Sequence, residues 1–326
     1  MNTKKILFTA TFTSSFIQED IRILQQCYNV TPCISSGFST LLKFFTLTPK
    51  HDITFSWFAS VYSSILIFFT KIFKKKSIII LGGVDVAKEK EFNYGIWNSW
   101  WKSIFVRYGI KNATAVFAVD DSLKKKAISL AKYDGKNIFT ISTGYDKNFW
   151  IPKGEKTHRI LTVAMCSNMT RIKVKGIDIF LNAAAQMPDV QFVIIGLTQE
   201  IAQQLSIPKN VEYYPPLSQK EILPFYQKAK VYAQFSRHEG LPNVLCEAML
   251  CECIPVGTKI AGIPNAIGDA GFLVDINNIN QIKETLSTAL HASPEIGKNA
   301  RQRIITHFDI SKREKSLYTM IDEILS

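Results

Sequence analysis

Short apolar runs alternate with longer amphipathic stretches along the first half of the chain. Residues 78–81 form an uninterrupted Ile/Leu run, which is typical of a strand buried on both faces of a parallel sheet. We predict strands over 6–10, 53–57, 77–81, 115–119 and 137–141. Between them, large apolar residues recur at the spacing of one helix face, which predicts a helix whose aromatic side packs into the core. The residues of that stripe are Trp97, Trp100, Trp101, Ile104, Phe105 and Tyr108.

The same alternation resumes after a polar segment. Residues 151–158 contain turn formers and charges, which predicts a linker. Strands follow over 160–164, 190–195 and 231–235, with helices about 177–184, 221–230 and 311–325. Two successive βα-alternating halves predict two doubly wound α/β domains. We place them at 1–152 and 153–310, with the last helix, 311–326, packing back on the first domain.

Length and composition agree with this organisation. A chain of 326 residues is longer than one core supports, and 47% hydrophobic with 20% charged residues is ordinary for globular proteins. These values exclude a disordered chain. The six cysteines include no C-x-x-C pair, which argues against a zinc site and a disulfide framework. We therefore expect a cytoplasmic protein.

The positive charge lies almost entirely in the first half. The net charge is +12, and residues 1–150 contribute 20 Lys/Arg against 10 Asp/Glu, whereas residues 151–326 contribute 19 against 17. Such asymmetry indicates an anionic partner, which could be a membrane surface or an acidic substrate, or else a basic solvated surface. The chain has no nucleic-acid recognition motif, so we do not expect it to bind nucleic acid.

An uncharged stretch in the first half raises the question of a membrane span. Residues 53–70 reach the lower length limit for a spanning helix, but six of them are Ser or Thr. A strand, a loop and a helix fit this composition better. The apolar run 65–69 is followed by Lys74, Lys75 and Lys76, so the helix could rest on the inner face of a membrane as part of a peripheral protein.

The most informative motif follows the strand predicted at 231–235. It reads SRHEGLPNVLCEAM over residues 236–249, at the carboxyl end of a parallel strand, where α/β folds bind ligands. Gly240 and Pro242 predict a tight loop, and Asn243 is placed to cap the helix that follows. A helix N-terminus attracts anions such as phosphate. Glu239 and Glu247 would then flank a phosphate cradle with two carboxylates.

This motif resembles the E-x7-E motif of the retaining glycosyltransferases of family four. The similarity extends over 254–257 and 266–275, and Gly82 to Asp85 are similar to a first-domain pattern. The resemblance implies the GT-B fold, in which two Rossmann-like doubly wound parallel-sheet domains face a cleft. It implies transfer of a sugar from a nucleotide-diphosphate sugar to a hydroxyl of a saccharide or lipid-linked acceptor, with retention of configuration. It also implies that neither a metal nor a cofactor is required.

The resemblance assigns roles residue by residue. Glu239 would orient the transferred sugar, and Glu247 would bind the ribose hydroxyls. Lys175, followed by Gly176, matches the family's Lys-Gly element and would stabilise the leaving diphosphate. The family's arginine is absent at Met169 and Thr170, and Arg171 is the nearest substitute. The other donor-binding residues would be Gly196, Gly240, Leu241, Pro242, Asn243, Val244 and Leu245, and those on the acceptor side Gly83 and Asp85.

Two other functions stay open. A nucleotide-sugar 2-epimerase shares the two-domain layout, and a non-catalytic nucleotide-sugar binder can be built on the same fold. The sequence contains no G-x-G-x-x-G and no P-loop motif, which argues against a dinucleotide enzyme and a P-loop NTPase. The expected site residues divide between a second domain that binds the nucleotide sugar and a first domain that binds the acceptor.

Overall fold

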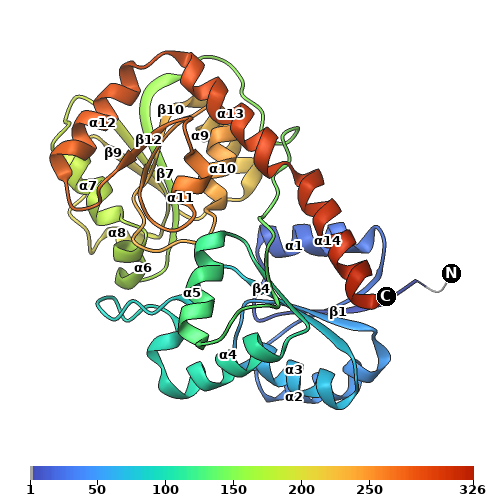
Figure 1. The fold of residues 1–326 in the computed structure, drawn as a ribbon. Helices are drawn as coiled ribbons and strands as arrows, with labels where there is room; N and C mark the ends of the chain where they lie inside the picture. The colour runs from blue at the N-terminus through green and yellow to red at the C-terminus, as the bar shows by residue number, and fades with distance from the viewer. Residues whose placement is uncertain (1–2) are drawn as a thin grey trace. The chain divides into compact units, whose positions relative to one another are not determined.

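A computed structural model describes residues 3–326 and contains two six-stranded parallel sheets flanked by helices (Figure 1). Contacts divide the chain into two compact units. The first unit runs to Gly144 and includes Ser311–Ser326, and the second unit is Tyr145–Ile310. The prediction of two doubly wound parallel-sheet units is therefore confirmed, and the division falls slightly before the position expected from the polar segment at 151–158.

The first sheet has the strand order β2-β1-β3-β4-β5-β6. Its strands are β1 (Lys5–Ala10), β2 (Asn29–Ile34), β3 (Ile53–Trp57), β4 (Lys76–Leu81), β5 (Ala115–Ala118) and β6 (Ile138–Thr140). The central strands are buried, as their apolar runs predict, apart from Lys76 at the start of β4. Strand β2 escaped prediction because it is an edge strand with Pro32 inside it and mostly exposed side chains.

Helices cover both faces of the first sheet. They are α1 (Ser15–Gln25), α2 (Phe38–Leu47), α3 (Val61–Ile72), α4 (Trp100–Asn112), α5 (Asp121–Ala131) and α14 (Ile310–Leu325), with short 3-10 turns at 48–50, 84–86 and 96–98. Figure 1 shows α1 and α14 on one face and α2 and α3 on the other. A buried ion pair fastens α14 to α1, with Arg313 Nη2 2.6 Å from Asp20 Oδ2. The same carboxylate accepts a hydrogen bond from the Trp57 indole at 2.8 Å.

Residues 53–70 form a strand, a loop and a helix, as expected. They comprise β3, the loop that ends at Ser60 and most of α3, and the Ser60 hydroxyl caps α3 by accepting from the Ser63 amide. Within residues 3–326, no helix is both long enough and apolar enough to cross a membrane.

The prediction that the aromatic stripe of α4 packs into the core is wrong. Trp97 is buried in the turn before the helix, but Trp100 is 76% exposed and Ile104 is 53% exposed. The buried face of α4 is formed instead by Val106, Gly109 and Ile110. Gly109 decides this orientation, because a Cβ there would lie 2.6 Å from the Ser64 hydroxyl of α3. The small face of α4 packs closely, so its large side chains remain outside.

The second sheet has the order β12-β11-β10-β7-β8-β9. Its strands are β7 (Thr157–Cys166), β8 (Gln191–Leu197), β9 (Val211–Tyr214), β10 (Ala229–Gln234), β11 (Ile254–Thr258) and β12 (Phe272–Val274). The helices are α6 (Met169–Val174), α7 (Ile177–Ala185), α8 (Gln199–Ala202), α9 (Gln219–Lys228), α10 (Asn243–Leu250), α11 (Ile263–Ile267), α12 (Ile279–His291) and α13 (Pro294–Phe308).

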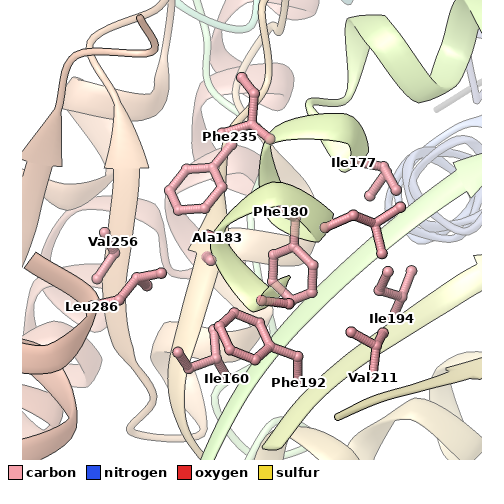
Figure 2. Packing of buried hydrophobic residues seen from close by; sticks show 14 of the residues in the cluster. Ile160, Ile177, Phe180, Ala183, Phe192, Ile194, Val211, Phe235, Val256 and Leu286 are labelled. Carbon is pink, nitrogen blue, oxygen red and sulfur yellow. The ribbon is translucent and has the colours of Figure 1, made fainter. Parts of the chain in front are cut away.

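Aromatic packing fixes α7 on the second sheet. Figure 2 shows Phe180 of α7 directed toward Phe192 of β8, and their ring centroids lie 5.2 Å apart in an edge-on arrangement. Leu286 of α12 and Val256 of β11 belong to the same buried cluster. This packing holds α7, and the loop before it, rigidly beside the carboxyl ends of β7 and β10.

Candidate active site

Glu239 lies in the loop between β10 and α10 and is only 8% exposed. Its Oε1 atom accepts hydrogen bonds from the Lys175 ammonium at 2.6 Å, the Ser236 hydroxyl at 2.7 Å and the Gln234 amide at 3.0 Å. Buried charges are tolerated when they are paired and hydrogen-bonded in this way. The structure thus brings Lys175 and Glu239, which are 64 residues apart in sequence, into direct contact.

A glycine makes this contact possible. Gly176, between Lys175 and α7, has φ of 68°, and a Cβ there would lie 1.8 Å from the Phe235 carbonyl oxygen. Only glycine allows the chain to start α7 so close to the end of β10. The Arg237 amide also donates to the Val174 carbonyl at 2.8 Å, which joins the loop after β10 to the end of α6. The Lys-Gly pair in the sequence therefore has a geometric reason.

A salt bridge behind this contact was not predicted. The Arg237 guanidinium makes two bonds to the Asp178 carboxylate, at 2.8 and 3.0 Å, and Lys173 approaches the same carboxylate at 3.2 Å. Burial opposes ionisation of Asp178, but the bonds and charges of Arg237 and Lys173 lower its pKa below the usual value. The pair ties α7 to the loop that carries Glu239. Its only sequence signal was an arginine inside the motif.

Glu247 lies within α10 and is 6% exposed. Its two carboxylate oxygens accept from the Gln219 amide at 3.2 Å and the Tyr226 hydroxyl at 3.3 Å, both on α9. The Gln219 bond is at the long end of the usual N–H···O range, and the Tyr226 bond is longer than usual for O–H···O. Burial raises the pKa of Glu247 to about 7, although these two bonds act in the opposite direction. Gln219 and Tyr226 lie two turns apart on one face of α9. This helical spacing could have identified them in the sequence as partners of one group.

The loop between the two glutamates is tightly constrained. Gly262 approaches it so closely that a Cβ there would lie 2.4 Å from the Gly240 carbonyl oxygen, and the Gly262 amide donates to that oxygen at 3.1 Å. Leu241 is buried. The residue that begins α10 as its N-cap is Pro242, so the prediction of Asn243 as the cap is wrong by one position. The Asn243 side chain instead accepts from the Tyr145 hydroxyl at 2.8 Å.

The backbone amides at the start of α10 are partly engaged. The Leu245 amide donates to the Pro242 carbonyl at 3.2 Å, a long bond with which a phosphate would compete. Val244 is the half-buried second residue of the helix, where amides lack intrahelical partners in general. The anion-binding role of these amides stays a prediction.

Arg171 and Gly196 flank the end of β7. The Arg171 Nε donates to the Met165 carbonyl at 2.7 Å. Burial raises the pKa of the Cys166 thiol to about 11, whereas the charges of Arg171 and Lys175 act in the opposite direction. Gly196, with φ of 109°, lets β8 approach the Ala164 carbonyl, from which a Cβ would be only 2.2 Å away.

Asp85 and Gly83 follow β4 in the first unit. The buried Asp85 carboxylate accepts from the backbone amides of Gly83 at 2.8 Å and of Ala59 and Gly82 at 3.1 Å. Burial raises its pKa to about 6, while the amide bonds lower it. Asp85 thus holds the loops after β3 and β4 together, and an acceptor-binding role for it stays a prediction.

Residues 3–326 include no group of three or more His, Cys, Asp or Glu side chains placed to hold a metal ion. A transfer that needs neither a metal nor a cofactor stays a prediction.

Comparison with known proteins shows which family the second unit resembles. Residues 152–306 match the family described as "Glycosyl transferases group 1". This unit is similar to the group 1 glycosyltransferases. The D-inositol 3-phosphate glycosyltransferase of Mycolicibacterium smegmatis is 28% identical over 191 residues, which cover 52% of this chain and 44% of that protein. The chain therefore spans less than half the length of this curated relative.

Solved structures cover nearly the whole chain and show its fold. HepE of Anabaena in complex with UDP superposes with a TM-score of 0.78 at 14% identity, covering 98% of this chain and 100% of that one. Sucrose-phosphate synthase from Thermosynechococcus elongatus gives 0.79 at 12% identity, covering 98% and 99%. The GT-B fold expected from the sequence is confirmed. All predicted donor residues lie within the part that resembles group 1, whereas Gly83 and Asp85 lie outside it.

Proposed function

We propose that this protein is a glycosyltransferase that moves a sugar from a nucleotide-diphosphate sugar to a hydroxyl of a saccharide or lipid-linked acceptor, in polysaccharide or glycoconjugate biosynthesis. The observation that carries the proposal is the part-buried contact of Lys175 with Glu239 near the carboxyl ends of β7 and β10. It lies where α/β folds bind ligands, inside the residues that match the group 1 family. HepE structures with UDP and UDP-glucose make uridine diphosphate sugars the first donors to test.

The charges of this cluster suit the departure of a nucleoside diphosphate. Negative charge grows on the diphosphate as the bond to the sugar breaks, and a positioned cation stabilises that charge in a water-poor site. Lys175 supplies the cation, and Glu239 positions it through the 2.6 Å bond. Arg171, whose charge acts on the Cys166 thiol as that of Lys175 does, would add a second positive charge. Glu239 would also orient the sugar, and retention of configuration follows from the family resemblance.

Glu247 suits recognition of the ribose. Its partners Gln219 and Tyr226 form long bonds, which leaves acceptor capacity on both carboxylate oxygens for ribose hydroxyls. Because the pKa of Glu247 is raised to about 7, only about half of this carboxyl is ionised at neutral pH in the free protein. Ribose hydroxyls that donate to the carboxylate would favour its ionised state.

The first unit would bind the acceptor, and the protein would work in the cytoplasm at the inner face of a membrane. The support for this location is the net charge of +10 on residues 1–150, since anionic lipids attract basic segments.

The proposal is tested by measuring donor binding and donor fate separately. Saturation-transfer NMR with a panel of nucleotide sugars should show one or more donors bound, with contacts from the ribose and the sugar. Incubation of the bound donor without acceptor should leave its sugar configuration unchanged, whereas formation of the 2-epimer would establish an epimerase instead. If none of the nucleotide sugars binds, and neither does UDP, the proposed function is wrong.

A further inference from the structure

Three helices of the first unit present large apolar side chains to solvent. Helix α3 packs between α2 and α4, and these helices lie away from α1 and α14, which cover the other face of the sheet (Figure 1). We define the apolar face as the exposed large side chains of α2, α3 and α4. They are Phe38, Leu42, Phe45, Phe68, Ile72, Trp100, Trp101, Ile104 and Phe105. Exposed apolar residues scattered singly need no explanation, but a contiguous group does.

Ring contacts and a shared cavity show that the apolar face is contiguous. Phe45 of α2 lies 5.7 Å from Phe69 of α3 between ring centroids, and Phe69 lies 5.9 Å from Phe68. A cavity of about 350 Å³ then opens between α3 and α4. Its lining residues are Ser64, Ile65, Phe68, Ile104, Phe105 and Tyr108. The apolar face therefore runs across all three helices, with a hollow that protein side chains do not fill.

The charges around the apolar face have one sign. Residues 38–47, 61–76 and 100–112 contain eight Lys or Arg and no Asp or Glu. In each helix a lysine adjoins an exposed apolar residue, as in Leu42-Lys43, Lys71-Ile72 and Trp101-Lys102. Neighbouring helix residues differ by about 100° in direction, so the lysines border the apolar stripe rather than interrupt it. Lysine stems can lie along apolar material while their ammonium groups stay in water.

We propose that the apolar face docks on an anionic lipid bilayer, with Trp100, Trp101 and Phe38 inserted at the headgroup level and the bordering lysines on lipid phosphates. Large apolar side chains together with Lys and Arg are the composition of interfacial helices. Tryptophan is enriched at the membrane–water boundary. The absence of carboxylates over three helices removes the repulsion that would otherwise oppose an anionic surface. The inference deepens the proposed function and rests on its membrane location, but it needs only the first unit.

Tryptophan fluorescence reports on this docking with little background. The chain has five tryptophans, and Trp57, Trp97 and Trp150 are at most 5% exposed. Changes in emission on adding vesicles therefore arise from Trp100 and Trp101. Vesicles of phosphatidylcholine with phosphatidylglycerol should shift the emission to the blue, and brominated acyl chains should quench it. Phosphatidylcholine alone should do so weakly, and added salt should reverse the binding.

Matched variants separate the two parts of the face. Lys43→Gln with Lys102→Gln, two exposed bordering lysines, should weaken binding to anionic vesicles roughly 30-fold, since each lysine near the surface contributes about 1 kcal/mol. The control is Lys312→Gln with Lys315→Gln, exposed lysines of α14 on the opposite face of the same sheet, and it should bind as the wild type does. Trp100→Gln with Ile104→Gln should weaken binding about 10- to 100-fold, whereas Ile151→Gln, also exposed, should not.

The result that would overturn the inference is equal binding by wild type and by both face variants, or an unchanged tryptophan emission at low salt. Sedimentation without lipid tests the other occupant of an apolar face, a second copy of the chain. Concentration-dependent dimers that Trp100→Gln dissociates would show self-association and also overturn it. Binding of nucleotide sugars is measured on the same variants and should be unchanged. Failure of the wild-type protein to bind any nucleotide sugar would instead refute the proposed function.

Discussion

Near the carboxyl ends of its strands, the second unit buries Glu239 and Glu247 and half-buries Lys175, whereas in the first unit the Asp85 carboxylate is buried against backbone amides. The helices of the two units differ in how far they expose large apolar side chains. In the first unit α2, α3 and α4 leave large apolar side chains exposed, whereas in the second unit α7 turns Phe180 and Ile177 into a closed core. One parallel-sheet architecture therefore carries the two proposed sites in different places, a strand-end loop in one unit and a helix surface in the other.

The largest effect we expect is on the stability of the first unit. Arg313→Ala removes one partner of a buried ion pair and leaves Asp20 uncompensated, which typically costs about 3–5 kcal/mol. Urea unfolding followed by tryptophan fluorescence should report it, because Trp57, whose indole donates to Asp20, is one of the five tryptophans. The control is Lys312→Ala at the neighbouring exposed residue, which should leave the stability unchanged. A loss below about 1 kcal/mol would show that α14 does not hold the first unit together.

The next effect concerns catalysis by the second unit. Lys175→Ala removes the cation proposed to stabilise the leaving diphosphate, so kcat should fall roughly 10²–10³-fold with a smaller change in donor binding. Glu239 keeps its bonds from Ser236 and Gln234, so the fold should survive. Steady-state kinetics at saturating donor measure the effect, and the exposed Lys209→Ala is the control. Retention of more than half the wild-type kcat would remove Lys175 from the mechanism.

Arg171→Ala, measured beside Lys175→Ala, tests whether a second cation contributes. The Arg171 Nε is already engaged by the Met165 carbonyl, so we expect a smaller fall in kcat than for Lys175. An unchanged kcat would leave Lys175 as the cation proposed for this role.

The comparison also shows what sequence patterns can resolve. The buried strands were predictable because runs such as 78–81 have one physical explanation, and the motif around Glu239 was recognisable because loop, helix and carboxylates are consecutive. The direction of α4 was not predictable, because its apolar residues occur on more than one face and the close approach of Gly109 to Ser64 selects among them. The partners Asp178, Gln219 and Tyr226 come from other elements, so only the fold reveals them.

Glu247→Ala should act on donor affinity rather than on turnover. Charge-assisted hydrogen bonds to ribose hydroxyls are worth about 1.5–3 kcal/mol each, so the donor Kd should rise roughly 10- to 150-fold. Calorimetry with a nucleotide sugar measures the change, and the exposed Glu284→Ala provides the control. An unchanged Kd would mean that Glu247 serves α9 and α10 only as a structural residue.

The smallest effect is a pH dependence that takes opposite signs for folding and for binding. The pKa of Glu247 is about 7 in the folded protein and near 4.5 when unfolded, so the folded state holds its proton more tightly. The contribution of this carboxyl to stability is therefore greatest below pH 4.5 and is lost as pH rises to 7. Donor binding that needs the ionised carboxylate should instead strengthen as pH rises through the folded pKa, by roughly tenfold between pH 6 and pH 8. The glycosylated diphosphate of UDP-glucose keeps its charge over this range. UDP-glucose is therefore a better ligand than UDP for the titration. Glu247→Gln should flatten both profiles, whereas a donor profile that kept its slope in this variant would assign the titration to another group.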